Sequence, residues 1–465
     1  MLNSEKAGLL QSFLGSLPDH IAARLAKAVE VDRLTEGSSL PHELILEALR
    51  PTLRRSGNLQ RTPTPLRLFC RPFEDLLSCI PRKDKQKGRI ARATVSPVWI
   101  WLSKSLIPDT AASYLLEVKA LVLAYKFEAA EARASAFRTV AGQALGAAIA
   151  ADRKGARLAL ISEAAVADAE EMALLLLAAP SMLEIQQMLP KPVPVLTDEL
   201  LWNLRRIYDE VAALVVDAAP YVPVVAMRRL AKPWEALKLG LLITHQAQDT
   251  LISSTDLGLV GDILFSEMEE CRVAIHAVRP PEFDVDALLK HLTGFTDVSS
   301  AIVKEVEILR RGKWGQRLLK DRAAVGAVMD GFMERAPKEI AGALPTQKTG
   351  FSGASRVSDF TRPVPEDRVM RALRYARLMV GCRKLAAAAS FGAKLADAMD
   401  EAMQTLRSYN EDVIKEMRTA EGVRREIVER QFQLCTELTA MLFSEEEADF
   451  LRRRGKAAQS AAQAA

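Results

Sequence analysis

The segment from residue 113 to residue 154, SYLLEVKALVLAYKFEAAEARASAFRTVAGQALGAAIAADRK, decides the fold class. It contains no proline, and Ala, Leu, Glu and Lys, which favour helices, make up most of it. We expect one helix of about ten turns or more that ends near Gly155. A second helical segment, RLALISEAAVADAEEMALLLLAA, follows at residues 157–179. Residues 109–190 are therefore predicted to form a long helical hairpin.

The rest of the chain has the same character. Of its 465 residues 49% are hydrophobic and 26% are charged, but only 6% are aromatic. The β-branched and aromatic residues that favour strands are sparse outside short patches. The sequence predicts an all-α, multi-helical protein of long antiparallel helices and helix pairs. A solenoid and a bundle remain open alternatives.

Proline and glycine divide this helical chain. Three prolines in MLPKPVPVLTD (188–198) predict an extended connector, because proline also disfavours helix in the residue before it. Residues 344–367, rich in Gly, Ser, Thr and Pro, predict a long loop. The predicted parts are an N-terminal short-helix domain with a basic loop (1–108), the helical hairpin (109–190), a central helical domain (197–343), a C-terminal long-helix segment (367–453) and a disordered tail (454–465).

Positive charge is concentrated in the first hundred residues. From Arg50 to Arg92 there are twelve Lys and Arg against three acidic residues, a local balance of +9 in a chain of net charge +4. The centre of this region is PRKDKQKGRIAR (81–92), where Gly88 and Pro81 favour an exposed, irregular loop. The candidate residues for binding an anionic partner are Arg82, Lys83, Lys85, Lys87, Arg89 and Arg92.

This basic loop has more than one interpretation. Lysine and arginine on a loop can neutralise phosphates without reading a base sequence, or can meet an acidic protein surface. A solvated structural loop and a membrane-surface contact are the other interpretations. The neighbouring Trp99 and Trp101 point about 200° apart on a helix. Trp99 is therefore expected to anchor its helix to the core.

No catalytic, cofactor or metal site is predicted. The segment GALPTQKTG (342–350) resembles a phosphate-binding loop, but Gln347 occupies the position of the second glycine. Histidine, cysteine and carboxylate residues show no metal-ligand spacing. Arg67 and Arg71 flank Cys70, and nearby cations can lower the pKa of a thiol. A buried core cysteine is the competing interpretation.

Cysteine content and hydropathy suggest a cytoplasmic protein. The five cysteines are odd in number and contain no CxxC pair, which suits a reducing compartment. The first residues, MLNSEKAGLL, lack the basic start of a secretory signal. The longest apolar runs are shorter than the ~20 residues of a membrane span, so no transmembrane segment is predicted.

The expected function is that of a non-enzymatic, cytoplasmic helical scaffold or adaptor that binds another macromolecule, with a protein as the expected partner. Two alternatives remain open. One is a nucleic-acid-associated protein that uses the basic loop 82–92. The other is an all-helical enzyme with a site between its helices. The oligomeric state is left open.

Overall fold

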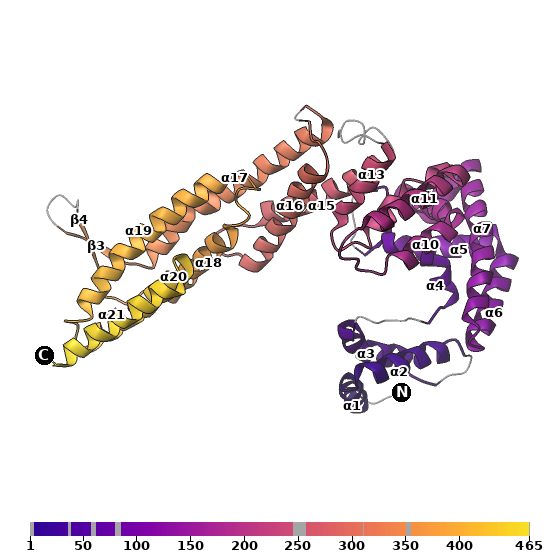
Figure 1. Cartoon of the computed structure of the whole chain (residues 1–465). Coiled ribbons are helices and arrows are strands. Elements are labelled where there is room, and N and C mark those ends of the chain that lie inside the picture. Colours follow the sequence, from indigo (N-terminus) through magenta and orange to yellow (C-terminus); the bar gives the residue numbers. More distant parts are fainter. Residues whose placement is uncertain are drawn as a thin grey trace. The chain divides into compact units, whose positions relative to one another are not determined.

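The protein is an all-α, multi-helical chain that folds as two compact units, Met1–Ile243 and Thr244–Ala465 (Figure 1). The boundary between the two units lies inside residues 197–343, which are predicted from the sequence to form one domain. The computed structural model describes residues 4–35, 39–56, 62–79, 85–244, 257–309, 311–349 and 355–464.

Unit 1 begins with three helices that share a core of their own. These helices, here called the N-terminal module, are α1 (Ser4–Gly15), α2 (Asp19–Asp32) and α3 (His42–Ser56). Helix α2 buries Ala22, Ala26 and Val29, at a helical spacing of three to four residues. The buried core of the module is made of Leu14, Ala22, Ala26, Val29, Ile45, Leu49 and Leu53.

Short elements follow the N-terminal module. They are α4 (Pro65–Cys70), η1 (Arg71–Leu76), β1 (Leu77–Ser78), β2 (Ile90–Ala91), η2 (Arg92–Thr94), α5 (Val95–Trp101) and η3 (Leu102–Leu106). Strands β1 and β2 pair in parallel, with Leu77 opposite Ile90. The Trp99 ring lies 5.2 Å from the ring of Phe69 and 5.9 Å from that of Phe137, between centroids. The predicted anchoring of Trp99 in the core is confirmed.

The predicted uninterrupted helix over residues 113–154 is wrong, because the chain turns at Tyr125. Helix α6 (Pro108–Leu123) ends there and α7 (Phe127–Ala151) begins two residues later. Tyr125 has φ 57°, and the amides of Tyr125 and Lys126 donate to the carbonyls of Val122 and Leu121. This is the Schellman arrangement, in which glycine usually takes the left-handed position. A tyrosine there gave no sequence signal for the turn.

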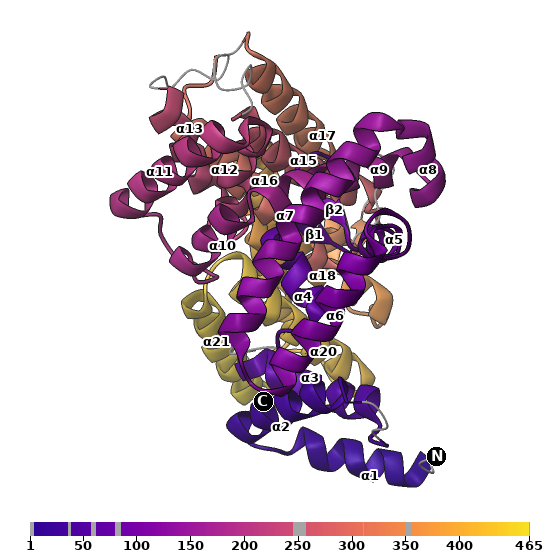
Figure 2. The same cartoon turned by 90° about the vertical axis from the view of Figure 1, so that its right-hand side faces the viewer.

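Six more helices and two short 3₁₀ turns complete unit 1. They are α8 (Arg153–Leu160), α9 (Glu163–Leu177), α10 (Ala179–Met188), α11 (Asp198–Leu214), η4 (Val216–Ala218), α12 (Tyr221–Met227), η5 (Pro233–Ala236) and α13 (Leu237–Thr244). Helix α9 packs along α7 (Figure 2). The contact is close at Gly142, where a Cβ would lie 3.0 Å from the carbonyl oxygen of Ala173.

Unit 2 is built of long helices, and a β-strand pair lies between α17 and α18. The helices are α15 (Gly258–Ala277), α16 (Val285–Glu305), α17 (Lys313–Gly342), α18 (Glu366–Cys382), α19 (Gly392–Glu416), α20 (Gly422–Leu442) and α21 (Glu445–Ala464). Helix α17 packs against α18 and α19, and α19, α20 and α21 pack against one another (Figure 1). The short connections on either side of α20 make α19, α20 and α21 run antiparallel in turn.

Two predictions for unit 2 differ from the structure. The loop predicted over residues 344–367 contains an antiparallel pair, β3 (Thr346–Thr349) and β4 (Ser355–Ser358), so a single long loop is not confirmed. Residues 454–464, predicted as a disordered tail, belong to α21. Packing explains this helix: a Cβ on Gly455 would lie 2.3 Å from Cζ of Phe432, so α21 approaches α20 at a residue without a side chain.

The contact between α15 and α17 gives a stability prediction. Trp314 is fully buried, and a Cβ on Gly261 would lie 2.1 Å from its Cζ2 atom. Gly261→Ala should lower the free energy of unfolding of unit 2 by about 1–3 kcal/mol, because the ring must move. The matched control is Gly331→Ala in α17, where no atom lies within 4 Å of the new Cβ. It should stabilise by about 0.5–1 kcal/mol. Urea unfolding followed by circular dichroism measures both; equal effects would contradict the packing argument.

Candidate functional site

The basic loop predicted to be exposed is partly folded into unit 1. Arg82 and Lys83 lie outside the described residues. The Lys85 ammonium lies 2.7 Å from Oδ1 of Asp168 and 2.9 Å from Oε1 of Glu171. Its side chain is only 17% exposed, so Lys85 neutralises carboxylates of its own chain.

The same two carboxylates of α9 hold the backbone that follows Lys85. The amide of Gly88 donates to Oε2 of Glu171 at 2.9 Å, and the hydroxyl of Thr94 donates to Oδ2 of Asp168 at 2.7 Å. The amide of Ala91 also donates to Oδ2 of Asp168, at 3.1 Å. Burial raises the pKa of the Glu171 carboxyl, and Lys85 acts against this shift. The described part of the loop is thus fixed by buried acids, which the helical pattern of α9 did not reveal.

The remaining candidates differ in exposure. Lys87 is exposed, and its ammonium lies 5.9 Å from the ring centroid of Tyr221. Arg89 is half-buried. Arg92 is exposed at the start of η2, next to a hollow of unit 1 that the sequence did not predict. Of the four candidates that the structure describes, Arg92 lines this hollow.

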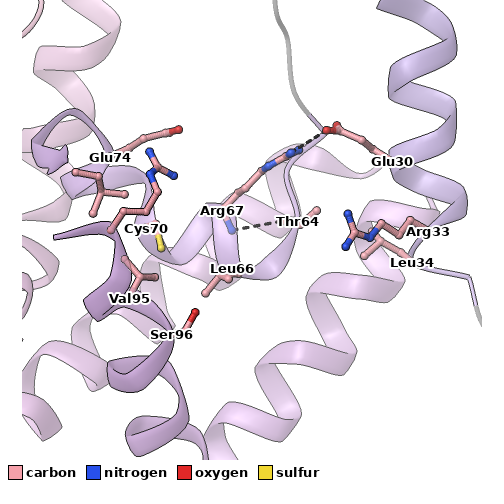
Figure 3. Close-up of a pocket in the computed structure, with 12 residues that line it drawn as sticks. Glu30, Arg33, Leu34, Thr64, Leu66, Arg67, Cys70, Glu74, Val95 and Ser96 are labelled. Atoms are coloured by element: carbon pink, nitrogen blue, oxygen red, sulfur yellow. Dashed lines mark hydrogen bonds and ion pairs between the residues drawn. The ribbon is translucent and has the colours of Figure 1, made fainter. Parts of the chain in front are cut away.

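This first hollow has a volume of about 490 Å³ and lies between α2 on one side and α4 and α5 on the other (Figure 3). Arg33 projects from α2, and Arg67 reaches from α4 toward Glu30 (Figure 3). The hollow is lined by Glu30, Arg33, Leu34, Thr64, Leu66, Arg67, Cys70, Glu74, Leu77, Arg92, Val95 and Ser96.

A second hollow of about 580 Å³ adjoins the first, since the two share Arg67 and Glu74. Its lining residues are Lys27, Thr62, Pro63, Arg67, Leu68, Arg71, Glu74, Phe127, Gln186 and Arg229. Together the two hollows are called the basic cleft below. Its cationic side chains are Lys27, Arg33, Arg67, Arg71, Arg92 and Arg229, and its lining carboxylates are Glu30 and Glu74.

Buried interactions position the cationic side chains of α4 and η1. Arg138 of α7 has no exposed surface, and its Nε donates to the carbonyl oxygen of Leu68 at 2.9 Å. Its Nη1 donates to Glu131, which also pairs with Arg71 at 3.1 Å. The hydroxyl of Thr64 accepts from the amide of Arg67 and caps α4. Arg67 and Arg71 therefore project from a segment that α7 holds in place.

Four of the six cations of the cleft already pair with carboxylates. The pairs are Arg67 with Glu30 at 2.7 Å, Arg71 with Glu131 at 3.1 Å, Arg229 with Asp75 at 2.7 Å and Arg33 with Glu43 at 2.8 Å. Lys27 lies over the ring of Phe127, 5.1 Å from its centroid. Within the described residues, Lys27 and Arg92 have no carboxylate partner. The cleft is thus cationic but largely compensated.

Cys70 lies at the wall of the first hollow, and its thiol is not activated. Burial raises its pKa to about 12; Glu74 adds to the shift and Arg92 opposes it. The interpretation as a buried core cysteine is confirmed, and a reactive thiol is not supported.

The basic cleft has the chemistry of an anion-binding surface with apolar walls. In the described part of the chain, no three histidine, cysteine or carboxylate side chains meet as a metal site.

None of the helices that the structure describes has an apolar stretch long enough to cross a membrane. Comparison with family models, curated proteins and solved structures finds no match to this chain. Function is therefore inferred from the cleft itself.

The buried cluster on α9 predicts a pH-dependent stability. Lys85→Met removes the cation from two buried carboxylates and should cost about 3–5 kcal/mol at pH 8. The raised pKa of Glu171 means that the fold favours its protonated form. The contribution of this carboxyl to the free energy of unfolding therefore falls as pH rises through that pKa. The deficit should therefore be smaller at pH 5. Lys87→Met is the control and should change stability by less than about 0.5 kcal/mol. A pH-independent deficit in urea unfolding would contradict this assignment.

The pKa of Cys70 predicts its reactivity. At pH 8 a thiol with a pKa of about 12 is ionised in roughly one molecule in ten thousand. Iodoacetamide should alkylate the exposed Cys79 at least about 100-fold faster than Cys70. Timed alkylation with peptide mass mapping measures the two rates. Comparable rates in the folded protein would restore Cys70 as a candidate nucleophile.

Proposed function

We propose that this chain is a non-enzymatic, cytoplasmic helical scaffold or adaptor that binds an anionic segment of another macromolecule in the basic cleft. The observation that carries this proposal is the convergence of six cationic side chains on two adjoining hollows. These side chains come from α2, α4, η1, η2 and the segment after α12. Sites that bind by charge complementarity are built in this way.

The dimensions of the cleft support a chain-like ligand. Each hollow alone has the volume of a small-molecule pocket, and the two hollows share the lining residues Arg67 and Glu74. Apolar side chains line the two hollows together with the cations, among them Leu34, Leu66 and Phe127. A polymer with both charged and apolar groups matches such a lining better than a compact ion does. The five cysteines are all free, which supports the proposed reducing location.

Nucleic acid is the second candidate, and exposed Lys87 and Arg92 are the observations that favour it. The internal pairing of four cleft cations weighs against it. A phosphate backbone gains most from cations that have no carboxylate partner, since counterion release then drives binding. We therefore favour a protein partner.

Charge reversal of the two cations without carboxylate partners tests the proposal. Because neither cation pairs with a carboxylate among the described residues, Lys27→Glu/Arg92→Glu breaks no ion pair of the described structure. The control Lys104→Glu/Lys154→Glu makes the same charge change at exposed positions that line neither hollow. The probes are a fluorescein-labelled 20-residue peptide of Glu, Asp and Leu and a labelled 20-nucleotide single-stranded DNA.

The peptide should bind the wild type, and the cleft variant should bind it at least about tenfold more weakly, a loss of about 1.4 kcal/mol. The control should stay within about twofold. Fluorescence anisotropy between 50 and 200 mM NaCl measures both. Unchanged binding by the cleft variant would overturn the proposal. Tighter binding of the DNA, with a steep salt dependence, would favour the nucleic-acid alternative.

A further inference from the structure

Glu30 of α2 lies in the basic cleft as a bound carboxylate would. Its Oε1 is 2.7 Å from Nη2 of Arg67, and its Oε2 accepts from the amide of Thr62 at 2.8 Å. The Glu30 side chain is only 14% exposed. A guanidinium on one oxygen and a backbone N–H on the other are the usual partners of a carboxylate in a recognition site.

The receptor side of this contact is pre-oriented. Nη1 of Arg67 donates to the carbonyl oxygen of Thr62 at 2.9 Å, which directs Nη2 toward Glu30. The hydroxyl of Thr64 holds the Arg67 amide, and Arg138 holds the following turn through Leu68. Only one partner in this arrangement comes from the N-terminal module, and that partner is the carboxylate of Glu30.

The side of α2 that faces the cleft makes a small set of contacts within the described residues. Helix α2 directs Ala22, Ala26 and Val29 into the core of the module and presents Lys27 and Glu30 to the cleft. Within the described residues, two further contacts accompany the pair with Arg67: the Thr62 hydroxyl donates to the carbonyl oxygen of Lys27 at 3.3 Å, and the Lys27 ammonium lies over the ring of Phe127. A ligand that replaces one carboxylate therefore competes with a small polar contact and leaves the apolar core intact.

We propose that Glu30 is an internal stand-in for the ligand, and that the cleft accepts a Glu or Asp side chain of an acidic protein segment in its place at Arg67. This inference rests on the proposed function and specifies its partner. The partner fits on two counts: its carboxylate repeats the contact that Glu30 makes, and its apolar residues meet Leu34, Leu66, Leu77 and Val95 of the first hollow.

The competition has a defined consequence. Partner binding must displace Glu30 from Arg67, so α2 restrains the cleft in the absence of a partner. By reciprocity, whatever weakens the Glu30 contact strengthens the binding of the acidic segment by the same factor. Glu30→Gln removes the negative charge while it keeps the shape of the side chain, so it isolates this effect.

The experiment uses the full chain and the labelled Glu/Asp/Leu peptide described above. Glu30→Gln should bind the peptide at least about threefold more tightly than the wild type. The matched control is Glu47→Gln, the same change at an exposed position of α3 that lines neither hollow, and it should equal the wild type. Glu30→Ala should behave as Glu30→Gln does, and circular dichroism must show unchanged helix content in each variant.

The outcomes separate the two proposals. If Glu30→Gln binds as the wild type does while Lys27→Glu/Arg92→Glu loses binding, the cleft is the binding site and the role of Glu30 is overturned. If Lys27→Glu/Arg92→Glu keeps full affinity, the proposed function fails as well. An equal gain in Glu30→Gln and Glu47→Gln would show a general charge effect and would also overturn the inference. Tighter binding by Glu30→Gln and Glu30→Ala alone supports it.

Discussion

The buried guanidinium of Arg138 is the constraint on which the rest of unit 1 depends. A fully buried cation is tolerated only when its donors are satisfied, and Arg138 achieves this with the carbonyl of Leu68 and the carboxylate of Glu131. Both partners belong to the structure around the cleft: Leu68 lies in α4, and Glu131 also binds Arg71. Phe137 precedes Arg138 in α7, and its ring stacks on that of Tyr114 in α6, with the centroids 4.0 Å apart. This stacking holds α6 against α7. Two successive turns of α7, from Glu131 to Arg138, thus fix both the helix hairpin and the base of the cleft.

A second buried cluster determines what the basic segment can do. The sequence has a local excess of positive charge near residue 85, but Asp168 and Glu171 of α9 neutralise Lys85. Similar compensation occurs at Arg67, Arg71 and Arg229 across the cleft. The basic residues of unit 1 therefore differ in the fold: several pair with carboxylates of the chain, whereas Lys27 and Arg92 have no carboxylate partner among the described residues.

The fold class followed from the sequence because it rests on composition and periodicity, which are local properties. The position of helix ends was less accessible. The turn between α6 and α7 depends on a tyrosine in the left-handed conformation, and α21 depends on the fit of Gly455 against Phe432. Each is decided by tertiary packing that overrides helix propensity. The cleft could not be predicted from the sequence for a related reason. Its residues Lys27, Arg92 and Arg229 are far apart along the chain, and only folding brings them together. Arg92 alone was identified as a candidate, through the local density of basic residues.

The ion pairs within the cleft reduce its net electrostatic attraction for an anionic ligand. Each paired cation must give up a carboxylate before it can bind another, so the net gain per contact is the difference between two similar ion pairs. A ligand that offers only negative charge gains little from such an exchange, and added salt reduces that gain further. Additional stabilisation must come from groups that Glu30 does not provide, and the apolar walls formed by Leu66 and Val95 are placed to meet them. Under the proposed function, such a cleft would discriminate by the combination of charge and apolar contact, which an acidic protein segment presents and a phosphate backbone does not.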